Sequence, residues 1–121
     1  MVGRRQREPG STGRGMEPFI LLLLAEGAAH GYEVAQAMTD WGFRRAARDP
    51  SGLYKVLRQL EEQGYLGSEW ALESAGPARR VYRLTEAGEA YLHERAQDLH
   101  RQAQRIAEFG ERYRERFPQQ R

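Results

Sequence analysis

The hydrophobic residues of this chain change their spacing several times, and each spacing predicts a different element. Between residues 49 and 66, apolar side chains recur at the helical spacing i, i+3, i+4 and i+7, namely Leu53, Val56, Leu57 and Leu60. Asp49 can accept a hydrogen bond from a first helical turn, Pro50 suits the first helical position, and Gly64 suits a left-handed C-terminal cap. The pattern predicts a helix with one packed face.

The opposite face of this predicted helix is basic at its beginning and acidic at its end. Its early positions are Ser51, Tyr54, Lys55 and Arg58, and its last are Glu61 and Glu62. This order opposes the helix dipole, which favours acidic residues at the start and basic ones at the end. A helix that presents its first turns to DNA would account for the order, because recognition helices place early residues against base edges and phosphates. An ordinary solvated face is the alternative interpretation.

Two further helices are predicted before this one. Residues 18–26 contain a run, 19–24, that is apolar on every side, which indicates a helix buried all round. Residues 30–42 form a second predicted helix, whose packed side is Val34, Ala37, Met38 and Trp41. Residues 43–48 are predicted as a loop that carries three arginines into the recognition helix.

A hairpin is predicted after the third helix. Residues 65–73 alternate between apolar and polar positions, as a half-buried strand does, and a second strand is predicted at residues 79–84. The turn between them, residues 74–78, contains Gly and Pro, and Arg79 and Arg80 stand beside it. Three helices followed by such a hairpin predict a mainly α fold with a small β-hairpin, the winged helix-turn-helix, in which the hairpin reaches phosphates or the minor groove.

A long helix is predicted from Thr85, whose hydroxyl suits an N-cap. Its apolar positions follow a heptad: Leu92, Leu99, Ile106 and Tyr113 alternate with Ala96, Ala103, Gly110 and Phe117. A helix this long cannot bury the seam on a small domain, so the same helix of a second subunit is the expected partner. Packing against the first helix of its own chain is the alternative.

The chain is therefore divided into a tail of residues 1–15, a DNA-binding domain of residues 16–84 and a dimerisation helix of residues 85–121. The tail is basic and has no apolar periodicity, so it is predicted to be disordered. It could lie along phosphates as an arm. It could equally be a solubilising leader, or the result of an upstream start codon with Met16 as the alternative start.

Composition narrows the function classes. With 121 residues the chain can bury one modest core, and its net charge of +2 hides a clustered distribution. Residues 44–58 and 79–83 are basic, whereas residues 61–73 carry only acidic charges. The chain has no cysteine, so a disulfide framework is excluded and a reducing cytoplasm is expected. The apolar run 19–25 is too short to cross a bilayer, which predicts a soluble, intracellular protein without a membrane partner.

Catalytic and metal sites are not expected. His93 and His100 are seven residues apart on one predicted helix, about 10 Å of rise, so they cannot bind one ion together. Glu61 and Glu62 are adjacent and project in different directions, which makes them poor as an acid and base pair. The chain also has no Ser/His/Asp arrangement with an oxyanion hole and no phosphate-binding glycine loop. We expect no enzyme activity, no metal and no cofactor.

Three aromatic residues are candidates for an effector pocket. Trp41 and Phe43 follow the second helix, and Trp70 lies in the hairpin. They could line a pocket for a small aromatic effector at a dimer interface, since flat apolar ligands favour such walls. Core packing is the alternative, and the sequence assigns no individual effector-binding residue.

Four fragments carry a resemblance to a known family. LLLLAEG, HGYEVAQAM, DPSGLYKVLRQLEEQGYLGSEW and GPARRVYRLTEAG, in this order and spacing, resemble the PadR family of bacterial transcriptional regulators. The resemblance extends from residue 17 to about residue 95. It implies a dimeric winged helix-turn-helix repressor that binds a palindromic operator and is released by a small molecule. The single C-terminal helix resembles the shorter subfamily, in which that helix dimerises.

The resemblance also assigns roles to individual residues. The residues that match the family's recognition helix are Ser51, Tyr54, Lys55 and Arg58, and those that match the basic start of the second wing strand are Arg79 and Arg80. The "HGYE" segment, residues 30–33, matches a structural corner. The sequence departs from the family in having Lys55 where many members have proline, and in its long basic leader.

The leading hypothesis is thus an operator-binding repressor whose partners are double-stranded DNA and a second copy of the chain. A small-molecule or drug-binding sensor, with a secondary role on DNA, is the first alternative. A winged-helix module that binds other proteins is the second.

Overall fold

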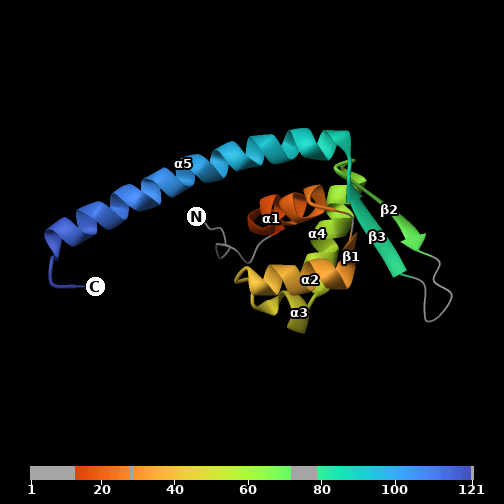
Figure 1. Cartoon of the computed structure of the whole chain (residues 1–121), viewed down its shortest axis with the longest axis horizontal. Coiled ribbons are helices and arrows are strands. Elements are labelled where there is room, and N and C mark those ends of the chain that lie inside the picture. Colours follow the sequence, from red (N-terminus) through yellow and green to blue (C-terminus); the bar gives the residue numbers. More distant parts are fainter. Residues whose placement is uncertain (1–12, 28, 72–78, 121) are drawn as a thin grey trace, which may run out of the picture.

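The computed structural model describes residues 13–27, 29–71 and 79–120. The fold is mostly helical, with a small three-stranded antiparallel sheet of order β1-β3-β2. The elements in chain order are α1 (Gly13–Ala25), β1 (Ala29–His30), α2 (Gly31–Asp40), α3 (Arg45–Arg48), α4 (Ser51–Glu62), β2 (Leu66–Ala71), β3 (Arg79–Leu84) and α5 (Glu86–Arg116). Figure 1 shows α1 to α4 and the sheet as one group, with α5 running across α1 and then beyond it.

The core lies between α1, α2, α4 and the sheet. The predicted stripe of α4 is confirmed, since all four of its apolar residues are buried. From the other elements the largest fully buried side chains are Ile20, Leu21, Met38 and Val34. Burial of an aliphatic side chain of this size contributes about 1.5 to 3 kcal/mol, so this cluster is the main source of stability.

The first helix begins earlier than predicted. α1 starts at Gly13, so Pro18 lies inside it and does not begin it. Proline has no N–H to bond the carbonyl of Arg14 four residues before it. That carbonyl instead accepts a 2.8 Å hydrogen bond from Nη2 of Arg95 on α5. The remaining residues of the predicted tail, 1–12, lie outside the described residues.

Three expectations about burial are wrong. Leu22 on α1 is 39% exposed, so this helix is not buried all round. Trp41 is 44% exposed because it lies at the end of α2, where the helix leaves the core. Trp70 is 58% exposed, although the alternation of β2 placed it on the packed face.

Two connections also differ from the prediction. Residues 43–48 are not all loop, because α3 forms there and buries Ala46. β1 was not predicted, since a two-residue strand has no periodicity; it pairs with β3 through Ala29↔Tyr82 and His30↔Val81.

The boundaries of α4 are partly as expected. The N-cap is Pro50, one residue after the predicted cap Asp49, whose carboxylate accepts a hydrogen bond from the Ser51 hydroxyl instead. Gly64 has a φ of +89°, the left-handed conformation expected of the residue after a helix.

The hairpin strands are confirmed. β2 pairs with β3 in a continuous antiparallel register that runs from Leu66↔Leu84 to Ala71↔Arg79. The predicted turn, residues 74–78, lies outside the described residues. At the other end of β3, Thr85 caps α5 as predicted, because its hydroxyl oxygen accepts a 3.0 Å hydrogen bond from the Gly88 N–H.

Within the described parts of the chain, no helix combines the length and the apolar character that crossing a membrane requires.

Candidate nucleic-acid interface

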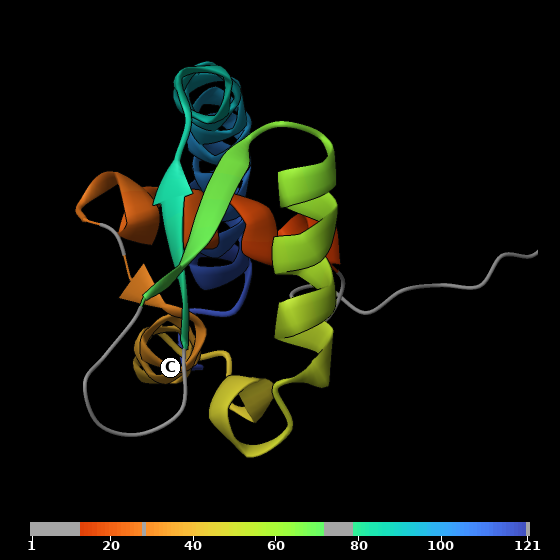
Figure 2. The same ribbon diagram turned by 90° about the vertical axis from the view of Figure 1, so that its right-hand side faces the viewer.

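The candidate DNA-binding surface is formed by α4, the start of α2 and the hairpin. Figure 2 shows α4 running beside β2 and β3, and β2 contacts α4. β1 joins β3 directly before α2 begins, so the first turn of α2 lies at the end of β3 where Arg79 stands. The tertiary fold thus brings segments 47 residues apart in the sequence into contact.

The exposed face of α4 carries most of the predicted recognition residues. Ser51, Lys55 and Arg58 are exposed, and the buried stripe behind them fixes the helix on the core. Tyr54 differs, because it is half-buried. A Cβ atom on Gly31 would stand 2.5 Å from Cε1 of the Tyr54 ring, so the ring lies directly over the first residue of α2.

Arg79 is held by α2. Its Nη1 donates a 2.5 Å hydrogen bond to the Tyr32 hydroxyl, and its guanidinium carbon lies 4.9 Å from the centre of the Tyr32 ring. The Tyr32 ring in turn stacks on His30, with centroids 5.4 Å apart and an angle of 4° between the planes. The sequence placed the "HGYE" segment as a structural corner; the structure makes Tyr32 the partner of a predicted DNA-binding residue.

Arg80 is held by the hairpin and α4. Its Nε donates a 3.0 Å hydrogen bond to Ser68 Oγ, and its guanidinium carbon lies 4.7 Å from the centre of the Trp70 ring. The Ser68 hydroxyl donates in turn to Glu61 Oε2 at 2.6 Å. Arg79 and Arg80 were predicted to act alike, yet they are oriented by different elements.

A small hollow lies where these elements meet. Its volume is about 180 Å³, and its walls include Tyr32, Tyr54, Arg79 and Arg80. Tyr82 also lines it; burial raises the pKa of this phenol, while the positive charge of Arg80 acts in the opposite direction. The hollow therefore offers phenol hydroxyl and guanidinium groups side by side.

The basic surface continues onto α3. Arg44, Arg45 and Arg48 are all exposed, next to the start of α4. They were not among the predicted site residues, although the clustered charge of residues 44–58 could have pointed to them. Tyr32 was missed because no signal in the sequence links it to Arg79.

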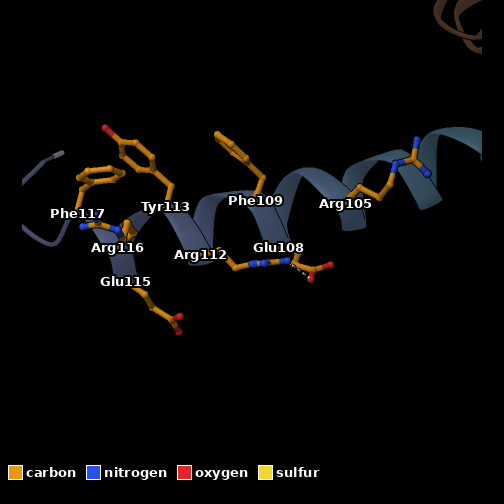
Figure 3. Close-up of a pocket in the computed structure, with 8 residues that line it drawn as sticks. All are labelled: Arg105, Glu108, Phe109, Arg112, Tyr113, Glu115, Arg116 and Phe117. Carbon is orange, nitrogen blue, oxygen red and sulfur yellow. Dashed lines mark ion pairs between the residues drawn. The ribbon is translucent and has the colours of Figure 1, made fainter.

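The heptad residues of α5 fall into two groups. Leu92 and Leu99 are half-buried, whereas Ala96, Ala103 and Ile106 are exposed. Figure 3 shows the end of the helix, where Phe109, Tyr113 and Phe117 project from one side and Glu108, Arg112 and Glu115 from the other. The exposed fractions of Ile106 and Phe109 are 60% and 68%, so a strongly apolar face is open to solvent in the single chain.

The beginning of α5 packs on the first helix of its own chain, which was the alternative interpretation for this helix. The Tyr91 hydroxyl donates a 2.6 Å hydrogen bond to Glu17, and the Tyr91 ring stacks on Tyr65 at 4.3 Å. Arg95 is buried between the helices, with Nε 3.8 Å from Glu17 Oε1. These contacts involve only the first turns of α5.

The candidate effector aromatics are separated. Trp41 and Phe43 both contact the edge or face of Phe19, at 4.8 and 5.1 Å between ring centroids. Trp70 instead lies under Arg80 on the hairpin.

Among the described residues, no group of three or more His, Cys, Asp or Glu side chains could hold a metal ion.

The chain is similar to known regulators. Residues 20–94 match the family model described as the transcriptional regulator PadR-like family. The transcriptional regulator Rv3488 of Mycobacterium tuberculosis is 38% identical over 87 residues, which cover 72% of this chain and 78% of that protein.

Solved structures share the fold. A conserved protein of unknown function, described as a potential transcriptional factor, is 33% identical and has a TM-score of 0.73, with 96% of this chain and 100% of that chain covered. Bacillus subtilis PadR in complex with operator DNA has a TM-score of 0.57 at 23% identity, and 65% of this chain and 45% of that chain are covered. The second likeness shows the fold alone.

Proposed function

This chain belongs to the PadR-like family of transcriptional regulators, and we propose that it binds double-stranded DNA sequence-specifically as a homodimer. The family and its structural relatives are transcriptional regulators and not enzymes. Residues 16–84 would form the DNA-binding domain and residues 85–121 the dimerisation helix. A cytoplasmic location fits this role.

The observation that carries the proposal is the basic face made by α4 and the hairpin. Lys55 and Arg58 are exposed on the side of α4 opposite its buried stripe, and Arg79 and Arg80 stand at the end of the neighbouring hairpin strand. A helix of this kind fits the major groove, while a basic hairpin beside it can reach the flanking backbone. Bacillus subtilis PadR, which shares the fold, is solved with operator DNA.

In this proposal Lys55 reads base edges, with Arg58 further along the helix and Ser51 at its start. Lys55 is exposed in the second turn and carries a long side chain, and such side chains bond the acceptor atoms of guanine in the major groove. Tyr54, which is half-buried with its ring over Gly31, would lie at the edge of the DNA major groove. Arg79 and Arg80 contact mainly the backbone.

The homodimer is proposed from the apolar face of α5. The expected seam residues are Leu92, Ala96, Leu99, Ala103, Ile106 and Tyr113, and those beyond the first turns have little cover from the rest of the chain. Large side chains such as Ile106 and Phe109 are costly to leave in water, at about 25 cal/mol for each Å² of apolar surface. The same helix of a second subunit would cover them, and the small residues Ala96 and Ala103 would allow close approach.

We further propose that the protein represses transcription by occupying its operator, and that a small aromatic effector releases it. The Phe19, Trp41 and Phe43 cluster supports an effector of this kind, because edge-to-face aromatic contacts suit flat ligands and Trp41 is half-exposed. An effector should change Trp fluorescence and weaken DNA binding at the same concentrations. A fluorescence change without any effect on DNA binding would favour the sensor alternative.

The test is a gel shift with the DNA upstream of the protein's own gene, followed by footprinting. A two-fold dimer presents two recognition helices, so we expect a protected inverted repeat with half-sites about 34 Å apart or a multiple of this distance. Random duplexes of the same length are the control. Equal affinity for both duplexes, or a protected site without dyad symmetry, would contradict the proposal.

A further inference from the structure

We propose that the hollow between α2, α4 and the hairpin is a seat for one phosphate of the DNA backbone, with Arg79 and Tyr32 as its contacts. The inference rests on the proposed DNA binding and adds a specific phosphate contact to it. Tyr32 lies on α2, outside α4 and outside the hairpin, and the family resemblance assigned it only to a structural corner.

Arg79 is preorganised for this contact. The hydrogen bond to the Tyr32 hydroxyl and the position over the Tyr32 ring fix the guanidinium group, and the Tyr32 ring itself stacks on His30. An arginine side chain loses rotamer entropy when it is immobilised, and here part of that loss already occurs on folding. Tyr32 is 49% exposed, so a ligand can approach this residue from the solvent.

The size of the hollow favours a phosphate group over an organic effector. Its volume of about 180 Å³ is smaller than the roughly 300 to 1,000 Å³ of pockets that bury drug-sized ligands. Tyr54 forms one wall of the hollow. Its ring lies so close to residue 31 that this position of α2 has no room for a side chain, which explains the glycine. The Tyr54 ring therefore covers Gly31, which is buried, and closes this side of the hollow.

The charges around the hollow suit an anion. Arg79 and Arg80 both line it, and guanidinium groups form strong hydrogen bonds with phosphate oxygens. Two carboxylates lie near, and both already accept hydrogen bonds. Glu33 Oε1 accepts from the His30 N–H at 2.8 Å, and Glu61 accepts from Ser68.

The position of the hollow fits the path of a DNA strand. α4 lies on one side and the hairpin on the other, so a strand that leaves the groove read by α4 toward the hairpin passes over it. Arg79 would neutralise the charge of the phosphate. The Tyr32 hydroxyl accepts a hydrogen bond from Arg79 and would donate a second hydrogen bond to a phosphate oxygen. Tyr32 is thus both a contact and a positioning residue for Arg79.

Arg79→Gln tests the seat, and Arg83→Gln is its matched control. Arg83 is an exposed arginine on the same strand, about 13 Å further from the hairpin turn, with its guanidinium group over Gly67. For duplex DNA, Arg79→Gln should reduce the slope of log K against log salt by about 0.9, the value for one phosphate contact. Arg83→Gln should leave the slope unchanged. Tyr32→Phe, which keeps the ring, should weaken binding roughly fivefold at low salt, as expected for one lost hydrogen bond.

Neutral methylphosphonates placed one at a time in the bound duplex identify the phosphate. At a single position in each half-site, the methylphosphonate should weaken DNA binding by the wild-type protein and by Arg83→Gln. It should not weaken DNA binding by Arg79→Gln any further. If Arg79→Gln and Arg83→Gln have equal slopes while wild type binds DNA, the seat is refuted and the proposed function stands. If wild type itself shows no salt-dependent binding to any duplex, the proposed function fails first.

A free oxyanion is the other source of the same chemistry. Inorganic phosphate, titrated against the full chain and followed by the NMR signals of Tyr32 and Gly31, should give no saturable binding at millimolar concentrations. Saturable binding that Arg79→Gln abolishes, and that weakens DNA binding, would identify a site for a soluble anion and overturn the assignment to the DNA backbone.

Discussion

Glu61 on α4 and Arg80 on β3 are joined through a single hydroxyl group, because Ser68 Oγ donates to Glu61 Oε2 at 2.6 Å and accepts from Arg80 Nε at 3.0 Å. From the sequence, a carboxylate near the end of α4 was explained by its distance from DNA. The structure adds a partner for it: Glu61 links α4 to the hairpin through Ser68, which also bonds Arg80, whose guanidinium group lies over Trp70.

Replacing Ser68 with alanine should destabilise the protein. Glu61 and Arg80 would both lose a partner in a half-buried place, at a cost of about 1 to 3 kcal/mol. The free energy of unfolding in urea measures this loss. Ser51→Ala removes an exposed hydroxyl bonded to Asp49 and should change stability by less than about 0.5 kcal/mol. Equal effects of the two variants would show that the link through Ser68 contributes nothing.

Gly31→Ala should be destabilising because of Tyr54. The added methyl group would stand 2.5 Å from the Tyr54 ring, and overpacking of this kind costs about 1 to 3 kcal/mol. The double variant Gly31→Ala with Tyr54→Leu should recover part of the loss, so the two changes should not be additive in urea unfolding. Additive losses would mean that another contact excludes a side chain at Gly31.

Lys55→Ala should reduce the discrimination between operator and random DNA. If Lys55 bonds a base edge, the operator loses about 1 to 3 kcal/mol of binding free energy while random DNA loses much less. Arg48→Ala removes the same charge from the exposed surface of α3 and should weaken both duplexes alike. Affinities for both DNAs across a salt series decide it. A uniform loss for Lys55→Ala would assign this residue to the backbone.

Ile106→Glu should convert a dimer into a monomer. In the single chain Ile106 is 60% exposed, so the substitution should leave the fold intact, whereas a carboxylate buried in the seam of a dimer costs several kcal/mol. Adding Leu99→Glu should strengthen the effect. Gln104→Glu places the same charge on an exposed position of α5 outside the heptad seam and is the control. Sedimentation measures the mass, and a dimer that survives both seam changes would show that α5 is not the interface.

Tyr91→Phe should alter the stability at alkaline pH. Burial, together with the hydrogen bond to Glu17, raises the pKa of the Tyr91 phenol above its usual value near 10. The folded state therefore holds this proton more tightly than the unfolded state, so the contribution is present below about pH 10 and is lost as pH rises through the raised pKa. The stability advantage of the parent protein over Tyr91→Phe should be largest near pH 7 and should shrink above pH 10. A constant difference in urea unfolding would contradict this assignment.

Much of the fold can be predicted from local sequence patterns. Hydrophobic periodicity predicts the buried stripe of α4 and the two hairpin strands. The conformational preferences of single residues predict the cap at Thr85 and the left-handed conformation of Gly64. These signals depend on neighbours within a few positions, so the sequence alone determines them. The same is true of the basic character of the candidate DNA surface, since charge does not depend on folding.

Only the tertiary structure decided which residues act together. α1 continues past Pro18 because Arg95, 81 positions from Arg14, bonds the carbonyl that proline leaves free. Arg79 is oriented by a hydrogen bond to Tyr32, which lies 47 positions away. No local sequence pattern around either residue predicts this contact. Trp70 is exposed although its strand position predicted burial, and the guanidinium group of Arg80 lies over its ring. Contacts between side chains far apart in the sequence depend on how the elements pack, and packing leaves no periodic signal in either partner.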